Sequence, residues 1–144
     1  MTAPEDARLR QLALAVLARR AGAAAGAEEI AAAVDRGYDD LVRVLTPIIG
    51  SIGVTALTDR TLHLVARDYP WLVPAPERPH AEQTFSRIIP SLKRQDPVVA
   101  TEGAAAVLAT FLGLLGTFIG QPLAARLWQQ AWPDAPFSAH TEDT

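Results

Sequence analysis

The chain has 144 residues, of which 49% are hydrophobic and 20% are charged, and it contains no cysteine. A chain of this length forms one domain that buries roughly two thirds of the surface of its unfolded state. The net charge of −3 argues against nucleic acid as a partner, because phosphate binding needs a basic face. The lack of cysteine excludes disulfides and thiol chemistry, and it fits a cytoplasmic protein.

The first predicted element is an amphipathic helix over residues 4–20. Its apolar side chains recur at helical spacing: Leu9, Leu12, Ala13, Val16 and Leu17. The arginines lie mostly off this stripe, on a face that we expect to be solvated. A signal peptide is the weaker interpretation, because Glu5 and Asp6 precede the apolar run and two arginines follow it.

Two further helices are predicted over residues 27–45 and 51–69. Thr46 and Pro47 mark the boundary between them, and residues 48–50 are expected to form an apolar corner. The inward face of the second of these helices is predicted to hold Ile52, Thr55, Ala56, Leu62, Val65 and Ala66.

Asp59, His63 and Arg67 follow one another at four-residue steps on that helix. This spacing is typical of a ladder of charges on a solvated surface. A proton carrier at His63, oriented by Asp59, is the alternative interpretation. The surface ladder is preferred, because the sequence places no nucleophile or second base nearby.

A proline-rich strap is predicted over residues 70–79, where four prolines forbid a regular helix and favour extended backbone. In the preferred interpretation its apolar side chains clamp the strap onto the helical bundle. In the alternative, the strap contacts a protein partner. The residues expected to form that partner-binding surface are Tyr69, Trp71, Leu72 and Arg78.

A helix with a kink or a break at Pro90 is predicted over residues 80–95, and a central helix over residues 97–119. Asp96 and Pro97 are typical of a helix start, and Gly120 is typical of a stop. One face of the central helix carries small residues that would let another backbone approach closely: Ala105, Ala109, Gly113, Gly116 and Gly120.

Residues 103–125 contain no charged side chain, and this run allows two interpretations. A helix that is apolar all round is usually buried at the centre of a bundle, and this is the preferred interpretation. The alternative is insertion of residues 103–125 into a membrane, because about 20 apolar residues span a bilayer.

The chain is predicted to end with a short helix over residues 122–132 and a mobile acidic tail over residues 137–144. Residues 1–136 would then form one helical domain. A weak internal echo pairs Ile48-Ile49-Gly50-Ser51 with Leu114-Leu115-Gly116-Thr117, since each precedes a helix that ends at an aromatic residue followed by proline.

The segment from Thr117-Phe118-Ile119-Gly120 to Ala131-Trp132-Pro133 resembles the C-terminal part of a group of uncharacterised small all-helical bacterial proteins. Leu62-His63-Leu64 and Tyr69-Pro70-Trp71-Leu72 fit the same group. The resemblance implies a bacterial helical protein and no particular activity. Where the group has an acidic residue after Phe-Ile-Gly, this chain has Gln121.

The sequence contains no recognisable catalytic, cofactor or metal motif. The three histidines lie far apart, and no glycine-rich loop follows a predicted strand. Adjacent acidic residues such as Glu28 and Glu29 point to different sides of a helix. We therefore expect neither an enzyme nor a protein that holds a cofactor or a metal.

The fold class expected from these patterns is an all-α, single-domain bundle of five to six helices around the helix 97–119. The preferred function is protein binding, by a small bacterial regulatory or adaptor module that is a cytoplasmic homodimer and does not bind nucleic acid. One alternative is the membrane-associated protein described above. The other is a bundle that binds an apolar small molecule beside the small-residue face, with polar contacts from Thr110, Thr117 and Gln121.

Overall fold

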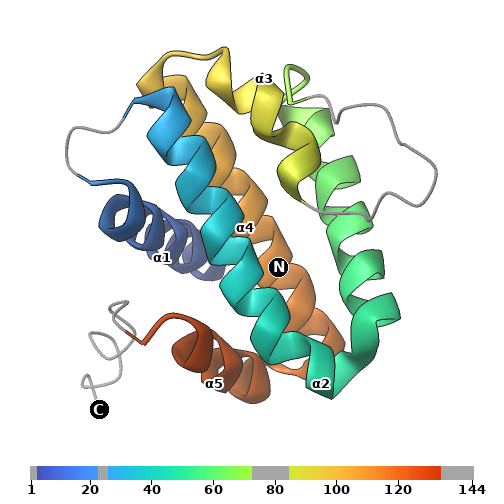
Figure 1. Cartoon of the computed structure of the whole chain (residues 1–144). Helices are drawn as coiled ribbons and strands as arrows, with labels where there is room; N and C mark the ends of the chain where they lie inside the picture. The colour runs from blue at the N-terminus through green and yellow to red at the C-terminus, as the bar shows by residue number, and fades with distance from the viewer. Residues whose placement is uncertain (1–2, 23–25, 73–84, 134–144) are drawn as a thin grey trace.

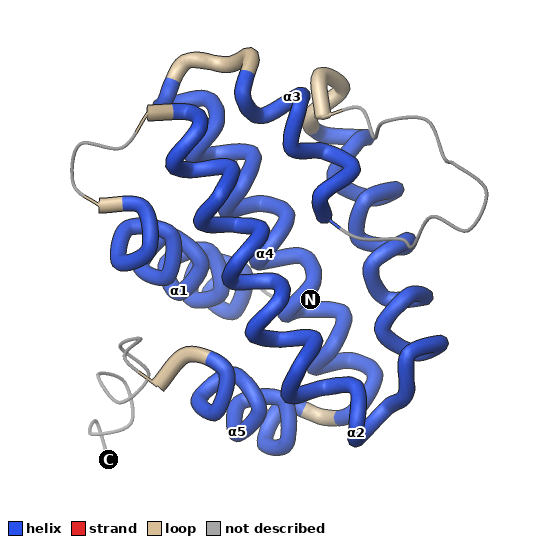
Figure 2. The backbone as a smooth tube through the Cα atoms, viewed as in Figure 1, coloured by secondary structure: helices blue, strands red, loops and turns tan. Residues whose placement is uncertain are grey.

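The computed structural model describes residues 3–22, 26–72 and 85–133. Within these residues the chain is helical and has no strand, which confirms the predicted all-α bundle (Figures 1 and 2). The elements in chain order are α1 (Ala3–Ala21), α2 (Ala27–Asp68), a 3-10 turn η1 (Phe85–Ile88), α3 (Ile89–Lys93), α4 (Pro97–Ile119) and α5 (Gln121–Ala131). Most of the predicted strap and the whole acidic tail 137–144 lie outside the described residues.

Helix α4 is the central element and has the predicted bounds. The Asp96 carboxylate accepts a hydrogen bond of 3.0 Å from the Val99 amide, and Pro97 occupies the first turn, where its missing N–H has no helical partner to lose. Helices α1, α2, α3 and α5 all contact α4. Figure 1 shows α4 behind the first half of α2, with α1 on one side and the second half of α2 on the other.

Helix α2 contains both of the helices predicted over 27–45 and 51–69, and the predicted boundary at Thr46 and Pro47 is wrong. The helix continues past Pro47 and turns sharply at Gly50, where φ is 82° and ψ is 160°. This region of backbone conformation is open almost only to glycine, because any Cβ there would be strained. We call residues 27–49 and 51–68 the first and second arms of α2.

Helices α4 and α5 repeat this arrangement. A first arm of 23 residues (27–49 in α2, 97–119 in α4) ends at a glycine of positive φ, which is 82° at Gly50 and 95° at Gly120. Each second arm ends at an aromatic residue of similar backbone conformation, Tyr69 (φ −128°, ψ 76°) or Trp132 (φ −131°, ψ 72°). The internal echo therefore aligns Gly50 with Gly120, four residues beyond the predicted Gly116.

The inward face predicted for the second arm of α2 is right in its C-terminal half, where Leu62 and Val65 are buried, and wrong in its N-terminal half. Ile52, Thr55 and Ala56 are exposed, and the buried residues are Val54, Thr58, Thr61, Leu62 and Val65. The buried threonines are tolerated because their hydroxyls donate to backbone carbonyls one turn earlier, at 2.9 Å for Thr58 and 2.8 Å for Thr61.

Of the kink or break predicted at Pro90, the structure shows a break. Pro90 lies in the first turn of the five-residue helix α3, which follows the 3-10 turn η1. The amides of a first helical turn have no intrahelical partner. Because α3 begins just before Pro90, the missing N–H of this proline costs the helix no hydrogen bond. Residues 80–84 of the predicted helix lie outside the described residues.

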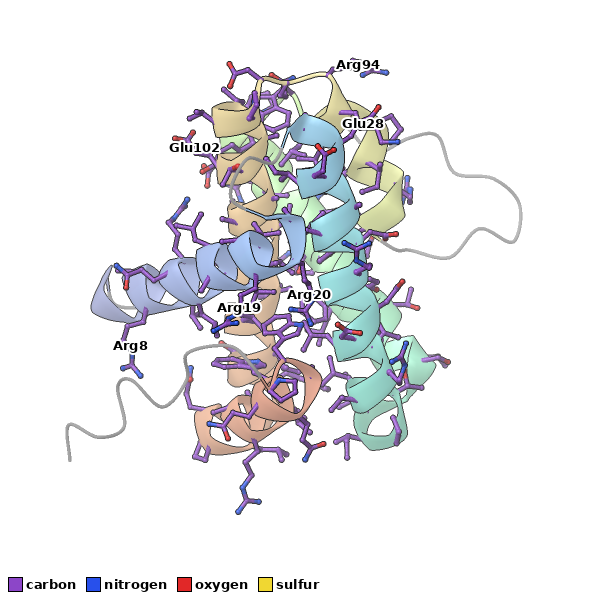
Figure 3. The ribbon with its side chains drawn as sticks, turned by 60° about the vertical axis from the view of Figure 1, so that its left-hand side comes forward. Arg8, Arg19, Arg20, Glu28, Arg94 and Glu102 are labelled. Carbon is purple, nitrogen blue, oxygen red and sulfur yellow. The ribbon has the colours of Figure 1, made fainter. Side chains whose placement is uncertain are left out.

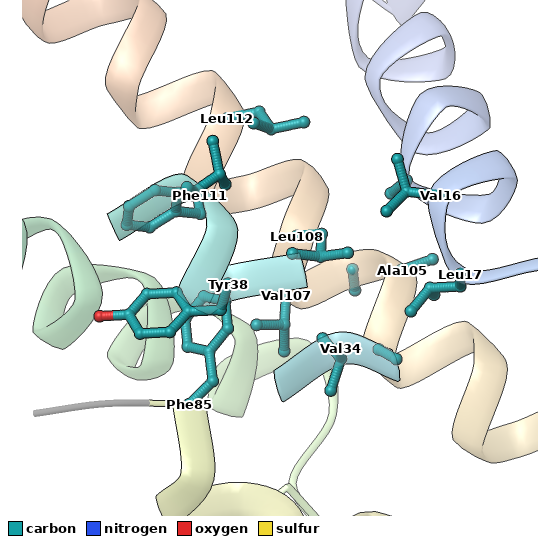
Figure 4. Close-up of a cluster of buried hydrophobic side chains, with 14 of the residues drawn as sticks. Val16, Leu17, Val34, Tyr38, Phe85, Ala105, Val107, Leu108, Phe111 and Leu112 are labelled. Atoms are coloured by element: carbon teal, nitrogen blue, oxygen red, sulfur yellow. The ribbon is translucent and has the colours of Figure 1, made fainter. Parts of the chain in front are cut away.

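Aromatic side chains from three elements meet in the core. The ring of Tyr38 packs 4.1 Å from that of Phe85 and 5.8 Å from that of Phe111, measured between centroids (Figure 4). The Tyr38 hydroxyl is 2.5 Å from Thr58 Oγ1, and it is the donor because the Thr58 hydroxyl already donates to the Val54 carbonyl. This bond joins the two arms of α2 across the turn at Gly50.

The end of α5 is fixed to the first arm of α2 by Trp132. Its indole is fully buried, and Nε1 donates a hydrogen bond of 3.2 Å to the Gly37 carbonyl. Among the described residues, Trp128 Nε1 is the buried side-chain donor that lacks a partner.

Candidate functional site: a groove along α4

A half-open groove of about 1000 Å³ runs along α4. Its floor is one face of α4, one wall is α1, and the other is the C-terminal end of α2. The lining residues are Leu9 and Arg10 from α1; Leu64, Val65, Arg67, Asp68 and Tyr69 from the end of α2; Ala106, Ala109, Thr110, Gly113, Leu114 and Thr117 from α4; and Gln121 from α5.

The floor of the groove is built mainly from small side chains. Its residues recur three and four positions apart, so they form a single stripe along α4. Because most of these side chains are no larger than threonine, α1 and the second arm of α2 leave open space above them. The Thr117 hydroxyl donates to the Gly113 carbonyl at 3.1 Å, while the Thr110 hydroxyl makes no hydrogen bond with the described residues.

The predicted small-residue face divides among three environments. Ala109 and Gly113 line the groove, and a Cβ added at Gly113 would lie 3.6 Å from the Leu9 side chain of α1. Ala105 is fully buried and lies near Leu17 of α1 (Figure 4). Gly116 is covered by the Gln121 amide, and Gly120 forms the turn into α5.

Two arginines from different helices line the groove. Arg10 comes from α1 and Arg67 from α2, and both side chains are exposed. Neither guanidinium has an ion pair among the described residues, whereas Arg20 of α1 is paired with Asp40 at 2.8 Å. Sequence reasoning missed this arrangement, because residues so far apart in the chain meet only through the packing of α1 and α2 against α4.

The structure separates the predicted partner-binding residues. Tyr69 lines the groove, and its ring meets that of Trp71 edge to face, with centroids 6.3 Å apart. Trp71 packs over Gly103, where an added Cβ would lie 2.5 Å from the indole. Leu72 is fully buried, so it offers no surface to a partner. Trp71 and Leu72 thus pack against α4 at Gly103, and Arg78 lies outside the described residues.

The charge ladder on the second arm of α2 remains on the surface. Asp59, His63 and Arg67 are all exposed, and within the described residues none of them forms an ion pair or hydrogen bond with another. Only Arg67 borders the groove. In the described part of the chain, no group of three or more histidine, aspartate or glutamate side chains is placed to hold a metal ion.

Two helices in the described residues, α2 and α4, are long and apolar enough to cross a membrane. The most apolar stretch of α4 is 56% buried inside the protein, but that of α2 is only 22% buried. The structure thus covers much of α4, including many residues of the uncharged run 103–125, with other helices of the same chain. The apolar stretch of α2 is covered far less.

Compared with models of protein families, with curated proteins and with solved structures, the chain has no match. The resemblance to small helical bacterial proteins therefore stays a prediction.

Proposed function

We propose that this protein is a small bacterial regulatory or adaptor module that binds an amphipathic helix of a partner protein in the groove along α4. The observation that carries this proposal is the groove itself, which is open to solvent and has a small-residue floor between two helical walls. Amphipathic helices bind in such grooves by laying their apolar face on the floor.

The dimensions of the groove support a helical occupant. From Ala106 to Thr117 the floor extends over 12 residues of α4, which is roughly 17 Å or three helical turns. The small side chains of Ala109 and Gly113 would let a partner helix approach closely. Arg10 and Arg67 border this floor against the single lining carboxylate of Asp68, so the polar edges of the partner helix should carry more aspartate or glutamate than lysine or arginine.

Photo-crosslinking in the native host tests this function. A photoreactive residue at Thr110 should crosslink a partner protein, while the same residue at Ala32, an exposed position of α2 outside the groove, should not. The helical segment of that partner is then made as a peptide, and its binding is measured by calorimetry.

Ala109→Phe fills the floor of the groove and should weaken peptide binding about tenfold or more, because it takes up the space that the helix needs. Ala32→Phe adds the same ring elsewhere on the surface and should leave binding unchanged. Equal crosslinking from both positions, or equal binding by both phenylalanine variants, would rule out the groove as the site.

The proposal includes a cytoplasmic homodimer, which the high apolar content for this chain length supports. Size-exclusion chromatography with light scattering measures the mass directly. A strict monomer at high protein concentration would remove the homodimer from the proposal and leave the groove unaffected.

A second candidate function is binding of an apolar small molecule in the same groove. It is favoured by one observation: Thr110, Thr117 and Gln121 all line the groove, as expected for polar contacts to such a ligand. Native mass spectrometry of the purified protein tests it. A co-purified molecule that Ala109→Phe displaces would favour this function, and protein of bare chain mass would count against it.

A further inference from the structure

Most of the exposed large apolar side chains lie at one end of the bundle. Ile48 and Ile52 flank the turn at Gly50, and Phe118 and Leu123 flank the turn at Gly120. Figures 1 and 2 show both turns at the same end, beside α5. Ile52 is 85% exposed and Phe118 is 61% exposed, so these side chains contribute little to the hydrophobic core. We call these four residues the corner face.

The helical segments on either side of the two turns carry no charged side chain. The charged residues nearest to Gly50 in sequence are Arg43 and Asp59, which are seven and nine residues away. At 1.5 Å per helical residue, this leaves roughly 10 Å of each arm of α2 uncharged. Around Gly120 the uncharged run extends from residue 103 to residue 125.

The formation of the hydrophobic core does not explain why these apolar side chains lie at the two turns. In the second arm of α2 the polar Thr58 and Thr61 are buried, while Ile52 of the same arm points to solvent. The face that Ile52 shares with Ser51, Thr55 and Ala56 borders a shallow depression on the surface, with Asp59 at its edge. An exposed apolar surface of this kind marks an interaction site.

The charges that border the corner face are mostly positive. Arg43, Arg60 and Arg126 lie within about ten residues of the two turns, and so do the acidic residues Asp40 and Asp59. Asp40 is half-buried and forms an ion pair with Arg20 of α1 at 2.8 Å, whereas Asp59 and the three arginines are exposed. Glu28, Arg94 and Glu102 lie at the opposite end of the bundle (Figure 3). The apolar end therefore has a basic border, and this arrangement complements a surface that is apolar beneath a layer of negative charge.

We propose that the corner face docks this protein on the surface of an anionic lipid bilayer. An amphipathic element lies roughly 5–10 Å deep at a bilayer surface, which matches the length of uncharged helix on either side of Gly50. The arginines at the border would then lie among the phosphate groups. This is a shallow contact by the two turns, distinct from a bilayer span by residues 103–125, because much of α4 stays buried against the other helices.

Co-sedimentation of the full chain with vesicles tests the proposal. The protein should pellet with vesicles of phosphatidylcholine and phosphatidylglycerol, and much less with phosphatidylcholine alone. The Ile52→Gln, Phe118→Gln double variant should lower the partition coefficient about tenfold or more, because both side chains lose their apolar contact with lipid. Arg126→Gln should lower it about fivefold, and only on the anionic vesicles.

The matched control is the Leu14→Gln, Val98→Gln double variant. It removes two exposed apolar side chains away from the corner face, and it should bind vesicles as the parent chain does. Circular dichroism checks that each variant is folded. If the Ile52→Gln, Phe118→Gln double variant is unfolded, the Ile52→Gln single variant replaces it. Three results would each overturn the proposal: a folded parent chain that stays in the supernatant, equal losses in both double variants, or a dimer that Ile52→Gln dissociates without any vesicle binding. The last result would assign the corner face to a second copy.

Discussion

At the scale of single residues, the glycines of the helices show how much the tertiary structure adds to helix propensity. Gly37 and Gly103 both lie inside helices, where glycine is less favourable than alanine by about 1 kcal/mol. Their surroundings differ, however. A Cβ at Gly37 would make ordinary contacts of 3.7 Å and 3.8 Å with Val16 and Trp132, whereas a Cβ at Gly103 would lie 2.5 Å from Trp71.

We therefore expect Gly37→Ala and Gly103→Ala to have opposite effects. Gly37→Ala should raise the free energy of unfolding by about 0.5–1 kcal/mol through helix propensity. Gly103→Ala should lower it by about 1–3 kcal/mol, because the rigid indole of Trp71 must move. Urea unfolding followed by circular dichroism measures both. A stabilised Gly103→Ala variant would show that Trp71 does not pack tightly over Gly103.

Asp35 gives a second prediction at this scale. Its partial burial and the neighbouring Asp39 carboxylate raise the pKa of Asp35 above 3.8, and Arg36 opposes them. The folded state therefore holds the proton more tightly than the unfolded chain does. The contribution of Asp35 to the free energy of unfolding is therefore most favourable below pH 3.8, falls as the pH rises through the pKa of the folded state, and stays lower at neutral pH.

Asp35→Asn should accordingly stabilise the fold at neutral pH, and the difference from the parent chain should vanish below pH 3.8. Denaturant titrations across this range measure the difference. An exposed carboxylate on the same helix, Glu28, offers the control: Glu28→Gln should not reproduce the effect. A gain for Asp35→Asn that is equally large in acid would show that the cause is not the carboxylate charge.

At the scale of elements, the two turns at Gly50 and Gly120 define the architecture. Each converts a 23-residue arm into a second arm of a different direction, through a backbone conformation of positive φ. At both positions an added Cβ would meet nothing within 4 Å. The cost of any other residue there would thus come from backbone strain alone.

Gly50→Ala and Gly120→Ala should each lower the free energy of unfolding by about 1–3 kcal/mol, which is the cost of holding alanine in this region. Thermal and urea unfolding measure the loss. Gly37→Ala is a useful comparison within the same helix, because Gly37 has ordinary helical backbone and an added Cβ there makes ordinary contacts. A loss at Gly37 as large as that at Gly50 would show that backbone strain at Gly50 is not the cause.

The elements also show why part of the helix pattern was predictable. Asp96, Pro97 and Gly120 act within a few residues of the ends of α4, so its bounds follow from local chemistry. The prediction was wrong at Pro47, since a proline near the end of the first arm of α2 is tolerated and the chain turns only at Gly50. Thr46, Pro47 and Gly50 are all residues that can end a helix. The packing of both arms of α2 decided that the chain turns at Gly50.

At the scale of the whole molecule, the structure offers two surfaces with different chemistry. The groove has a small-residue floor bordered by Arg10 and Arg67, while the corner face has large apolar side chains and a basic border. Ala109 of the groove and Ile52 of the corner face lie on different helices, and Ile52 does not line the groove.

Because Ala109 and Ile52 lie on different helices and Ile52 does not line the groove, the two proposed functions should separate by mutation at these positions. Ala109→Phe should weaken binding of the partner helix and leave vesicle binding unchanged, and Ile52→Gln should do the reverse. Calorimetry and vesicle co-sedimentation on the same two preparations give both measurements. Loss of both activities in both variants would indicate a single shared site, or unfolding, which circular dichroism distinguishes.

The sequence by itself determined that the chain is all-α, that residues 97–119 form its central apolar helix, and that Asp96 and Gly120 bound that helix. These features depend on periodicity and on capping groups, which act over one or two helical turns. The tertiary structure alone decided that Ile52 faces outward, that Trp71 and Leu72 are clamped against the bundle, and that Arg10 and Arg67 share a groove. The physical reason is that an inward face is chosen by what packs against it: Thr58 and Thr61 satisfy their hydroxyls within their own helix and can be buried, which leaves Ile52 at the surface.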